Sequence, residues 1–221
     1  MKTAKEYFDM GMERLKTLNP VPSLISALKY ANEGAKDDVL NINGCANYQW
    51  GAALVDVWQP KQVVELGGAM GVWALCLLQY LKPENQLYSI TLKEGGLEFS
   101  YVKDHYPNFH PIVGNDLDME NWEGVNLKQT DLWYIDTGIA DDHFGEQLRK
   151  ELDLYSPLFK RGSLILFDDI HKNEGMSRVW EELTRQGRWG LHSFYDATDP
   201  LHWTGYGLVV WNYYDDEHGE T

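Results

Sequence analysis

The segment 62–81 constrains the fold of this chain more than any other. Residues 62–66 form a short β-branched run, which predicts a buried strand, and the run opens into a glycine-rich turn at 67–71. An apolar stretch over 72–81 follows directly and predicts a helix. A strand that turns through glycines into a helix is typical of an α/β fold, because the helix carries the chain back to start a second parallel strand.

The rest of the chain repeats this alternation of strand and helix, which predicts one α/β domain with a parallel sheet covered on both faces. The last two strands are close enough in sequence to pair antiparallel. We expect an N-terminal helical cap at 1–58, an α/β core at 59–213 and an acidic tail at 214–221. Further strands are predicted at 87–92, 110–114, 131–136, 164–167, 189–195 and 206–211, and further helices at 1–35, 44–58, 98–105, 145–159 and 175–186.

The charge of the chain excludes some classes of partner. Asp and Glu number 34 against 19 Lys and Arg, a net charge of −15, and no basic cluster is present. Such a field repels phosphate backbones and anionic membrane surfaces, so we expect neither nucleic acid nor membrane as a partner. No run approaches 18 apolar residues and the first residues lack the apolar region of a signal peptide, so we expect a cytoplasmic protein.

The glycine turn does not fit the two commonest phosphate-binding motifs. Counted from Gly67, the second and third glycines of a nicotinamide-type GxGxxG motif would fall on Ala69 and Val72. The GxxxxGK[ST] motif of ATP-binding loops is absent as well. A turn with these small residues still lets the backbone approach a ligand beyond the carboxyl end of its strand.

A second unusual feature is the stretch LILFDDIH, in which four apolar residues run into Asp168 and Asp169. Burying a carboxylate is costly unless it is paired, hydrogen-bonded or bound to a metal. The plainer interpretation is a loop whose aspartates cap backbone N–H groups. Asp136, at the end of the strand in WYIDTG, is a third carboxylate in a comparable position and favours a functional interpretation.

The segment VVELGGAMG resembles motif I of class I S-adenosylmethionine-dependent methyltransferases, and the order of elements over 45–212 is similar to that fold. WYIDTGIADDH and ILFDDIH resemble the acidic strand ends of small-molecule O-methyltransferases, including macrolide-sugar O-methyltransferases and the cephalosporin hydroxylase group. The resemblance implies a Rossmann-like, mainly parallel seven-stranded sheet with a C-terminal antiparallel hairpin and helices on both faces.

The resemblance also implies S-adenosylmethionine as cofactor and assigns residues to its methionine part. Glu65 would hold the amino group of the cofactor. Gly67, Gly68 and Gly71 would let the backbone approach it.

At the nucleoside end this chain departs from the family pattern. The family places an acid at the end of the second strand to bridge the ribose hydroxyls, and here that position is Thr91. Thr91 offers a single hydroxyl, so either Glu94 reaches in or nucleoside affinity is weak. Asn115 or Asp116 stands where the family contacts the adenine amino group, with Asn115 slightly favoured.

The three strand-end carboxylates would lie side by side in this topology, where a Mg²⁺-like divalent cation would relieve their repulsion. The resemblance implies that Asp136, Asp168 and Asp169 hold this metal, with Asp136 also facing the cofactor. The distance in sequence between the two acidic strand ends is longer than usual in the family. Asp142 therefore stays open as the third ligand in place of Asp136.

The implied reaction is methyl transfer to a hydroxyl of a small molecule, with a base that removes the hydroxyl proton. His143 and His171 are the candidate bases, and Asp142 could take part. The N-terminal helices would cover the acceptor or form the surface of a homodimer or higher homo-oligomer. Two alternatives stay open: hydroxylase-like or other chemistry on the same fold, and a non-catalytic module that binds the cofactor or a metabolite, which Thr91 favours.

Overall fold

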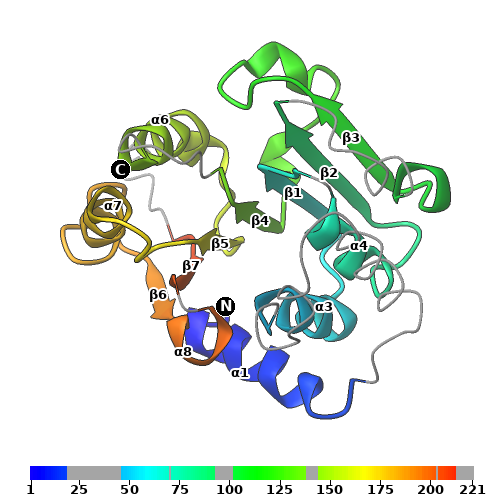
Figure 1. Ribbon diagram of the computed structural model, residues 1–221, viewed down its shortest axis with the longest axis horizontal. Coiled ribbons are helices and arrows are strands. Elements are labelled where there is room, and N and C mark those ends of the chain that lie inside the picture. Colours follow the sequence, from blue (N-terminus) through cyan, green and yellow to red (C-terminus); the bar gives the residue numbers. More distant parts are fainter. Residues whose placement is uncertain (19–45, 70, 93–101, 138–143, 203, 213–221) are drawn as a thin grey trace, which may run out of the picture.

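The computed structural model describes residues 1–18, 46–69, 71–92, 102–137, 144–202 and 204–212. These residues form a seven-stranded sheet in the order β3-β2-β1-β4-β5-β7-β6 (Figure 1). The pairs among β1 to β5 are parallel, whereas β7 pairs antiparallel with both β5 and β6. The expected Rossmann-like sheet with an antiparallel C-terminal hairpin is therefore confirmed.

The strands β4 and β5 are buried along their whole length, because helices cover both faces of the sheet. This burial explains why β4 and the first four residues of β5 are apolar. The strands are β1 (Gln62–Leu66), β2 (Gln86–Thr91), β3 (Phe109–Val113), β4 (Leu132–Ile135), β5 (Leu164–Asp168), β6 (Ser193–Asp196) and β7 (Tyr206–Val210).

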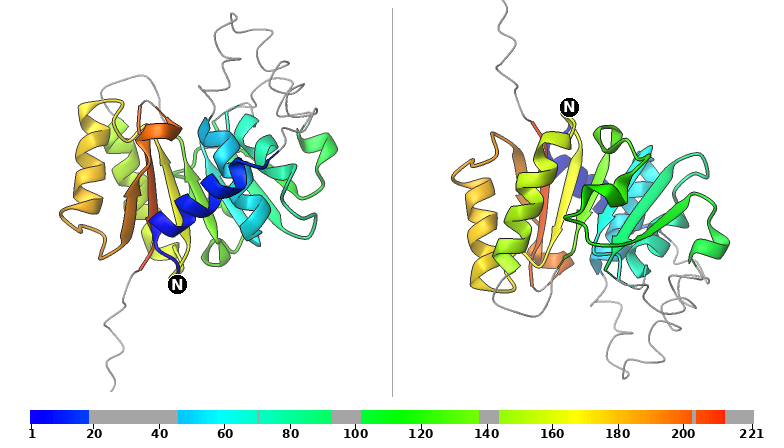
Figure 2. Two further views of the ribbon diagram at one scale, coloured as in Figure 1. Left: turned by 90° about the horizontal axis from the view of Figure 1, so that it is seen from below. Right: turned by 90° about the horizontal axis from the view of Figure 1, so that it is seen from above.

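The helices form two layers, one on each face of the sheet (Figures 1 and 2). One layer contains α1 (Ala4–Leu15), α3 (Ala46–Trp58) and α4 (Val72–Leu78), and the other contains α6 (Phe144–Tyr155) and α7 (Glu174–Thr184). A short helix, α8 (Thr198–Leu201), precedes β7. Short 3-10 turns occupy Met119–Trp122, Leu127–Gln129 and Ser156–Leu158. No helix in these ranges is long and apolar enough to cross a membrane.

Adjacent residues of β4 point into opposite cores, as alternation along a strand requires. Tyr134 faces the α3 and α4 layer, where its ring stacks on Trp73 at 4.2 Å between centroids. Trp133 faces the α6 and α7 layer and packs against Phe159 at 4.8 Å. This alternation places the phenol of Tyr134 beneath the carboxyl edge of the sheet on one defined face.

The predicted strand at 189–195 is wrong at its start, because β6 begins only at Ser193. Gly187 and Gly190 adopt φ values of 63° and 123°, so the chain turns there instead of extending. The predicted helix at 72–81 ends at Leu78 in the structure. Most of the predicted helix at 98–105 and the second half of the N-terminal helical region lie outside the described residues.

Candidate functional site

The glycine turn lies between the ends of β2 and β4, and close packing requires its glycines. The N–H groups of Gly67 and Gly68 donate to the carbonyl oxygen of Ile90 at 3.0 and 2.9 Å. A Cβ on Gly67 would lie 1.8 Å from the carbonyl oxygen of Asp136, and one on Gly68 would lie 1.9 Å from Oγ of Ser89. The turn therefore packs directly against neighbouring strand ends, with no room for a side chain at Gly67 or Gly68.

Gly71 completes the turn and starts α4. Its φ of 76° is in the left-handed region, and its N–H donates to the carbonyl oxygen of Gly68 at 2.6 Å. Because α4 begins directly after it, the first N–H groups of the helix lie next to the turn. Met70 lies outside the described residues.

Glu65 lies beneath this turn as a buried carboxyl group. The hydroxyl of Ser89 on β2 donates a hydrogen bond to its Oε2, and a Cβ on Gly68 would lie 3.1 Å from the same oxygen. Burial raises the pKa of Glu65 to about 7, against the opposing effect of the Ser89 hydrogen bond. A cation that reached this carboxylate would favour its ionised form.

The carboxylates that follow β4 and β5 converge, as their strand order predicts. Asp168 and Asp169 are only 6% and 8% exposed. Burial raises the pKa of Asp168, and the charge of Asp169 adds to the rise, while His202 opposes it. The pKa of Asp136 is raised well above its ordinary value, first by burial and then by the charges of Asp168 and Asp169.

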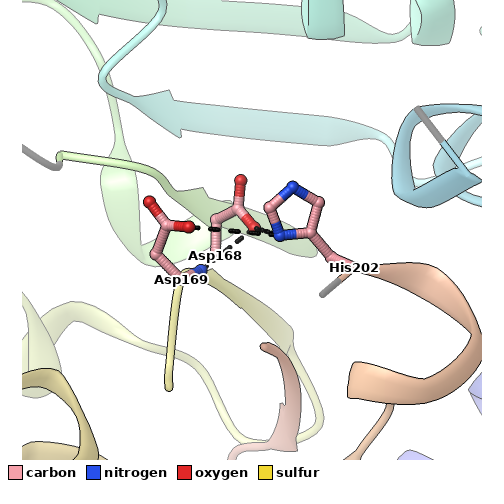
Figure 3. Close-up of side chains that lie close together, drawn as sticks. All are labelled: Asp168, Asp169 and His202. Carbon is pink, nitrogen blue, oxygen red and sulfur yellow. Dashed lines mark hydrogen bonds and ion pairs between the residues drawn. The ribbon is translucent and has the colours of Figure 1, made fainter. Parts of the chain in front are cut away.

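His202 joins this acidic cluster from the loop between α8 and β7. Its Nδ1 lies 3.5 Å from Oδ1 of Asp168 and 4.0 Å from Oδ1 of Asp169 (Figure 3). One ligand atom from each of the three residues lies within 4.8 Å of the others. Two carboxylates and an imidazole in this arrangement could hold a divalent cation. The sequence alone did not predict that His202 belongs to the acidic cluster.

Asp169 is held by two further side chains. Nζ of Lys172 lies 2.5 Å from its Oδ2, and the hydroxyl of Thr204 donates to its Oδ1. The backbone of Asp169 has a φ of 60°, and its N–H donates to Oδ1 of Asp168 at 3.0 Å. These contacts fix a residue whose left-handed conformation is costly for a non-glycine. Lys172 is a positive charge at the cluster that was not expected from the sequence.

The candidate bases are only partly described. His171 is exposed, and its Nε2 lies 2.7 Å from Oδ2 of Asp196 on β6. Its backbone N–H donates to the carbonyl oxygen of Thr204 at 2.7 Å. Asp142 and His143 lie outside the described residues.

The residues predicted for the nucleoside end lie near the carboxyl ends of β2 and β3. Thr91 ends β2, and its carbonyl oxygen accepts from the N–H of Gly114 at 2.9 Å. Asn115 is exposed, and its Oδ1 accepts from the N–H of Leu117 at 3.0 Å, so its side chain caps the local turn. Asp116 is buried instead, with an exposure of 8%. Glu94 lies outside the described residues.

Asp116 forms a buried carboxyl pair with Glu151 of α6. Burial and the charge of Asp116 raise the pKa of Glu151 well above its ordinary value. Thr137 and Gln147 donate to the two oxygens of Glu151, each at 2.8 Å. Oδ2 of Asp116 is buried without another hydrogen-bond donor, and a proton on Glu151 would supply one. Burial and the neighbouring carboxylate therefore favour the protonated form of Glu151.

Comparisons with known proteins identify a related domain and similar folds. Residues 64–170 match a family described as a methyltransferase domain. A comparison with curated protein sequences finds no match. The chain is similar in structure to the O-methyltransferase TomG from Streptomyces achromogenes, which is involved in tomaymycin synthesis and was solved with S-adenosylmethionine. That match has 16% identity, covers 96% of this chain and 100% of that one, and has a TM-score of 0.64.

Two further solved structures have a similar fold. An O-methyltransferase from Bacillus cereus, solved with S-adenosylhomocysteine, has 15% identity, coverage of 94% and 100%, and a TM-score of 0.62. A proposed caffeoyl-CoA O-methyltransferase from Staphylococcus aureus has 17% identity, coverage of 94% and 98%, and a TM-score of 0.62. The matched domain agrees with the expected resemblance to methyltransferases, and the solved structures confirm the expected fold.

Proposed function

We propose that this chain, which carries a methyltransferase domain over residues 64–170, transfers a methyl group from S-adenosylmethionine to a hydroxyl group of a small molecule. One observation carries the proposal. The glycine turn packs directly against Asp136, so the cofactor turn and the acidic cluster meet at the ends of adjacent strands. A donor bound at the turn would thus lie beside an acceptor bound at the cluster, and such positioning supplies much of the rate of methyl transfer.

The described residues supply complementary groups for each part of the cofactor. The buried carboxylate of Glu65 is suited to the amino group, since a bound ammonium would lower its pKa and offset its burial. Gly67, Gly68 and Gly71 would let the backbone approach the methionine part of the cofactor. Thr91 remains the proposed contact to the ribose. For the adenine, the buried Asp116 is better suited than Asn115, whose side chain already caps a turn.

The residues of the acidic cluster fit a divalent cation, with Mg²⁺ proposed. Asp168, Asp169 and His202 would hold it, with Asp136 or Asp142 as a further ligand. A cation there would bind the acceptor hydroxyl and lower its pKa. The raised pKa values of Asp136 and Asp168 support this assignment, because converging buried carboxylates favour either protons or a cation.

The proton of the acceptor would pass to a histidine. His171 is the described candidate, since Asp196 orients its ring in the way that carboxylates commonly orient catalytic histidines. His143, assisted by Asp142, remains the second candidate. The choice depends on which ring reaches the acceptor hydroxyl, so the pH profiles of His171→Gln and His143→Gln would separate them.

A second candidate function needs no metal, and the position of Lys172 favours it. The ammonium group of Lys172 lies 2.5 Å from Oδ2 of Asp169 and places one positive charge at the cluster. In this version Lys172 stabilises the ionised acceptor oxygen directly. A chelator would then leave the transfer rate unchanged, whereas Lys172→Met would abolish the transfer. If the enzyme depends on a metal, adding a chelator to the unaltered protein would stop turnover.

The first test is calorimetric titration with S-adenosylmethionine, with and without Mg²⁺. Absence of binding at millimolar cofactor would refute the proposal. Asp168→Asn and His202→Ala should weaken Mg²⁺ binding, whereas Asp153→Asn, an exposed aspartate of α6, should leave it unchanged. Affinity for Mg²⁺ that is equal in all these variants would remove the metal role.

To identify the acceptor, the protein is incubated with S-adenosylmethionine and a set of hydroxylated aromatics and sugars. Mass spectrometry then detects the added methyl group. Cofactor binding without transfer to any hydroxyl compound would favour the non-catalytic binding module. Oxygen insertion in place of methyl transfer would favour hydroxylase-like chemistry.

Other features remain predictions. These are a cytoplasmic location, a homodimer or higher homo-oligomer formed through the N-terminal helices, and the division into a cap at 1–58, a core at 59–213 and a tail at 214–221. Light scattering coupled to size-exclusion chromatography would measure the oligomeric state directly.

A further inference from the structure

Glu151 of α6 is a fully buried carboxyl group that the proposed reaction does not use. Its two oxygens receive donors from different segments. Oε2 accepts from the hydroxyl of Thr137 and Oε1 accepts from Nε2 of Gln147, each at 2.8 Å. The carboxyl group of Asp116 faces the same side chain. Such a buried group holds its neighbours in place, because a shift of any of them would leave a polar atom unpaired.

Thr137 connects Glu151 to the glycine turn. It follows Asp136 directly after β4, and its backbone nitrogen would lie 3.2 Å from a Cβ on Gly67. Thr137 therefore packs against the turn where the methionine part of the cofactor is proposed to bind. Its hydroxyl is held by Glu151, so the buried carboxyl group fixes one neighbour of that turn.

Asp116 connects Glu151 to the loop that follows β3. This loop starts at Gly114, whose N–H donates to the carbonyl oxygen of Thr91 at the end of β2. The helix α6 holds the loop a second time, because the hydroxyl of Tyr155 donates to the carbonyl oxygen of Asp116. Oδ2 of Asp116 is enclosed without another donor, so a proton on Glu151 would complete its hydrogen bonding.

The order of the strands places this link beside the proposed nucleoside end of the site. The strands β3 and β4 are separated by β2 and β1, which is about 14 Å at the usual spacing between strands. Because Asp116 and Thr137 both contact Glu151, the loop after β3 runs back past β2 and β1 towards β4. A nucleoside bound beyond the carboxyl ends of β1 and β2 would therefore rest on segments that Glu151 ties together.

We propose that Glu151 is a positioning residue of the cofactor site, which fixes Thr137 and the loop after β3 so that they fit the nucleoside part of S-adenosylmethionine. Being fully buried, it acts through Asp116 and Thr137 and does not contact the cofactor. Burial and the charge of Asp116 raise the pKa of Glu151, which agrees with this role because the protonated form can donate to Asp116. The inference rests on the proposed function, since it concerns the same cofactor site.

Calorimetric titration with two ligands tests this role. S-adenosylhomocysteine has both the nucleoside and the amino-acid part, whereas 5′-methylthioadenosine has the nucleoside without the amino acid. Glu151→Ala should bind both ligands at least about tenfold more weakly than the parent, because it leaves Asp116 without that donor. Glu65→Gln should weaken only the binding of S-adenosylhomocysteine, since Glu65 is proposed to hold the amino group.

Conservative variants separate positioning from a general loss of structure. Glu151→Gln keeps a donor for Asp116 and should recover most of the affinity for 5′-methylthioadenosine. Thr137→Val removes one hydrogen bond to Glu151 and should weaken this binding about fivefold. Glu181→Gln, at an exposed ion-paired position of α7, is the matched control and should bind as the parent does. If Glu151→Ala does not fold, Thr137→Val decides the question.

The outcomes distinguish this inference from the proposed function. Unchanged affinity of Glu151→Ala or Thr137→Val for 5′-methylthioadenosine would overturn the role of Glu151. A Glu151→Gln protein that binds as weakly as Glu151→Ala would do the same, and so would a parent that binds S-adenosylhomocysteine but not 5′-methylthioadenosine. A parent that binds neither ligand would instead refute the proposed function.

Discussion

The hydroxyl of Tyr134 donates a hydrogen bond to Oδ2 of Asp168 at 3.0 Å, between two residues that are both buried. The ring of Tyr134 is itself stacked on Trp73, so the hydroxyl has little freedom to move. Oδ1 of the same carboxylate faces His202 and the N–H of Asp169. Tyr134 thus orients the carboxylate at the centre of the proposed cation site.

Tyr134→Phe removes this hydrogen bond while keeping the stacked ring. Hydrogen bonds to charged groups are worth about 1.5–3 kcal/mol. We therefore expect the affinity for Mn²⁺, used here as a probe in place of Mg²⁺, to fall about tenfold or more. Calorimetric titration with Mn²⁺ measures the change. Tyr88→Phe, at a half-buried position of β2, is the control and should not alter affinity. If both variants bind Mn²⁺ equally well, Tyr134 does not position the site.

Glu65 predicts a pH dependence of stability. Its pKa is raised in the folded state, so its contribution is fully present below its ordinary pKa of 4.5 and is lost as the pH rises through about 7. The loss amounts to roughly 3 kcal/mol. Glu65→Gln keeps the Ser89 hydrogen bond and does not ionise, so its melting temperature should exceed that of the parent at pH 8 and match it near pH 4.

Glu174→Gln, at an exposed position of α7, is the control for Glu65→Gln and should follow the parent at both pH values. The same Glu65→Gln variant should lose affinity for S-adenosylmethionine, because an amide does not pair with an ammonium group. If the melting temperatures of Glu65→Gln and the parent changed equally between pH 4 and pH 8, burial would not raise the pKa of Glu65.

Gly68→Ala should disrupt the turn, since its Cβ would lie 1.9 Å from Oγ of Ser89. We expect a loss of stability of about 1–3 kcal/mol from overpacking, together with loss of cofactor binding. Ser89→Ala added to Gly68→Ala removes the clashing atom and should restore part of the stability. Thermal melting and cofactor titration are the two measurements.

Gly124→Ala provides a contrasting control for Gly68→Ala. Gly124 has a φ of 82°, and a Cβ added there would meet no atom within 4 Å, so the Ala substitution costs only the strain of a left-handed backbone. It should be less destabilising than Gly68→Ala and should leave cofactor affinity unchanged. A Gly68→Ala protein that binds the cofactor normally would show that the turn tolerates a side chain.

Glu151→Gln tests the carboxyl pair with Asp116. The raised pKa of Glu151 means that its stabilising proton is lost as the pH rises, whereas glutamine keeps a donor at every pH. The variant should therefore lose less stability than the parent in alkaline solution. Glu151→Ala, which leaves Asp116 without that donor, should be less stable than the parent at neutral pH. Identical alkaline melting of the parent and Glu151→Gln would argue against a protonated Glu151.

The strands and the convergence of their aspartates were predictable from the sequence, because both depend on local patterns. Residues 62–66 are a β-branched run that ends at glycines, residues 164–167 are an apolar run that ends at carboxylates, and parallel strands bring such ends to one edge. The start of β6 was not predicted, because the aromatic and aliphatic residues at 189–195 suggest a strand, whereas Gly187 and Gly190 turn the backbone.

His202 and Lys172 were missed for a different reason. His202 is 34 residues from Asp168 and reaches it only because β7 pairs antiparallel with β5. Tertiary packing sets this contact, so no spacing in the sequence reveals it. The contact between Lys172 and Asp169 is local, three residues apart in a turn, but the sequence does not show that the chain turns there, with Asp169 in a left-handed conformation.

The position of β7 between β5 and β6 imposes an order on folding during synthesis. A ribosome completes β6 before β7, yet β6 contacts the sheet only through β7. Until β7 emerges, the edge of β5 presents unpaired backbone groups and apolar side chains, a surface prone to misassociation. The strand β7 thus completes the sheet, because β6 joins it only through pairing with β7.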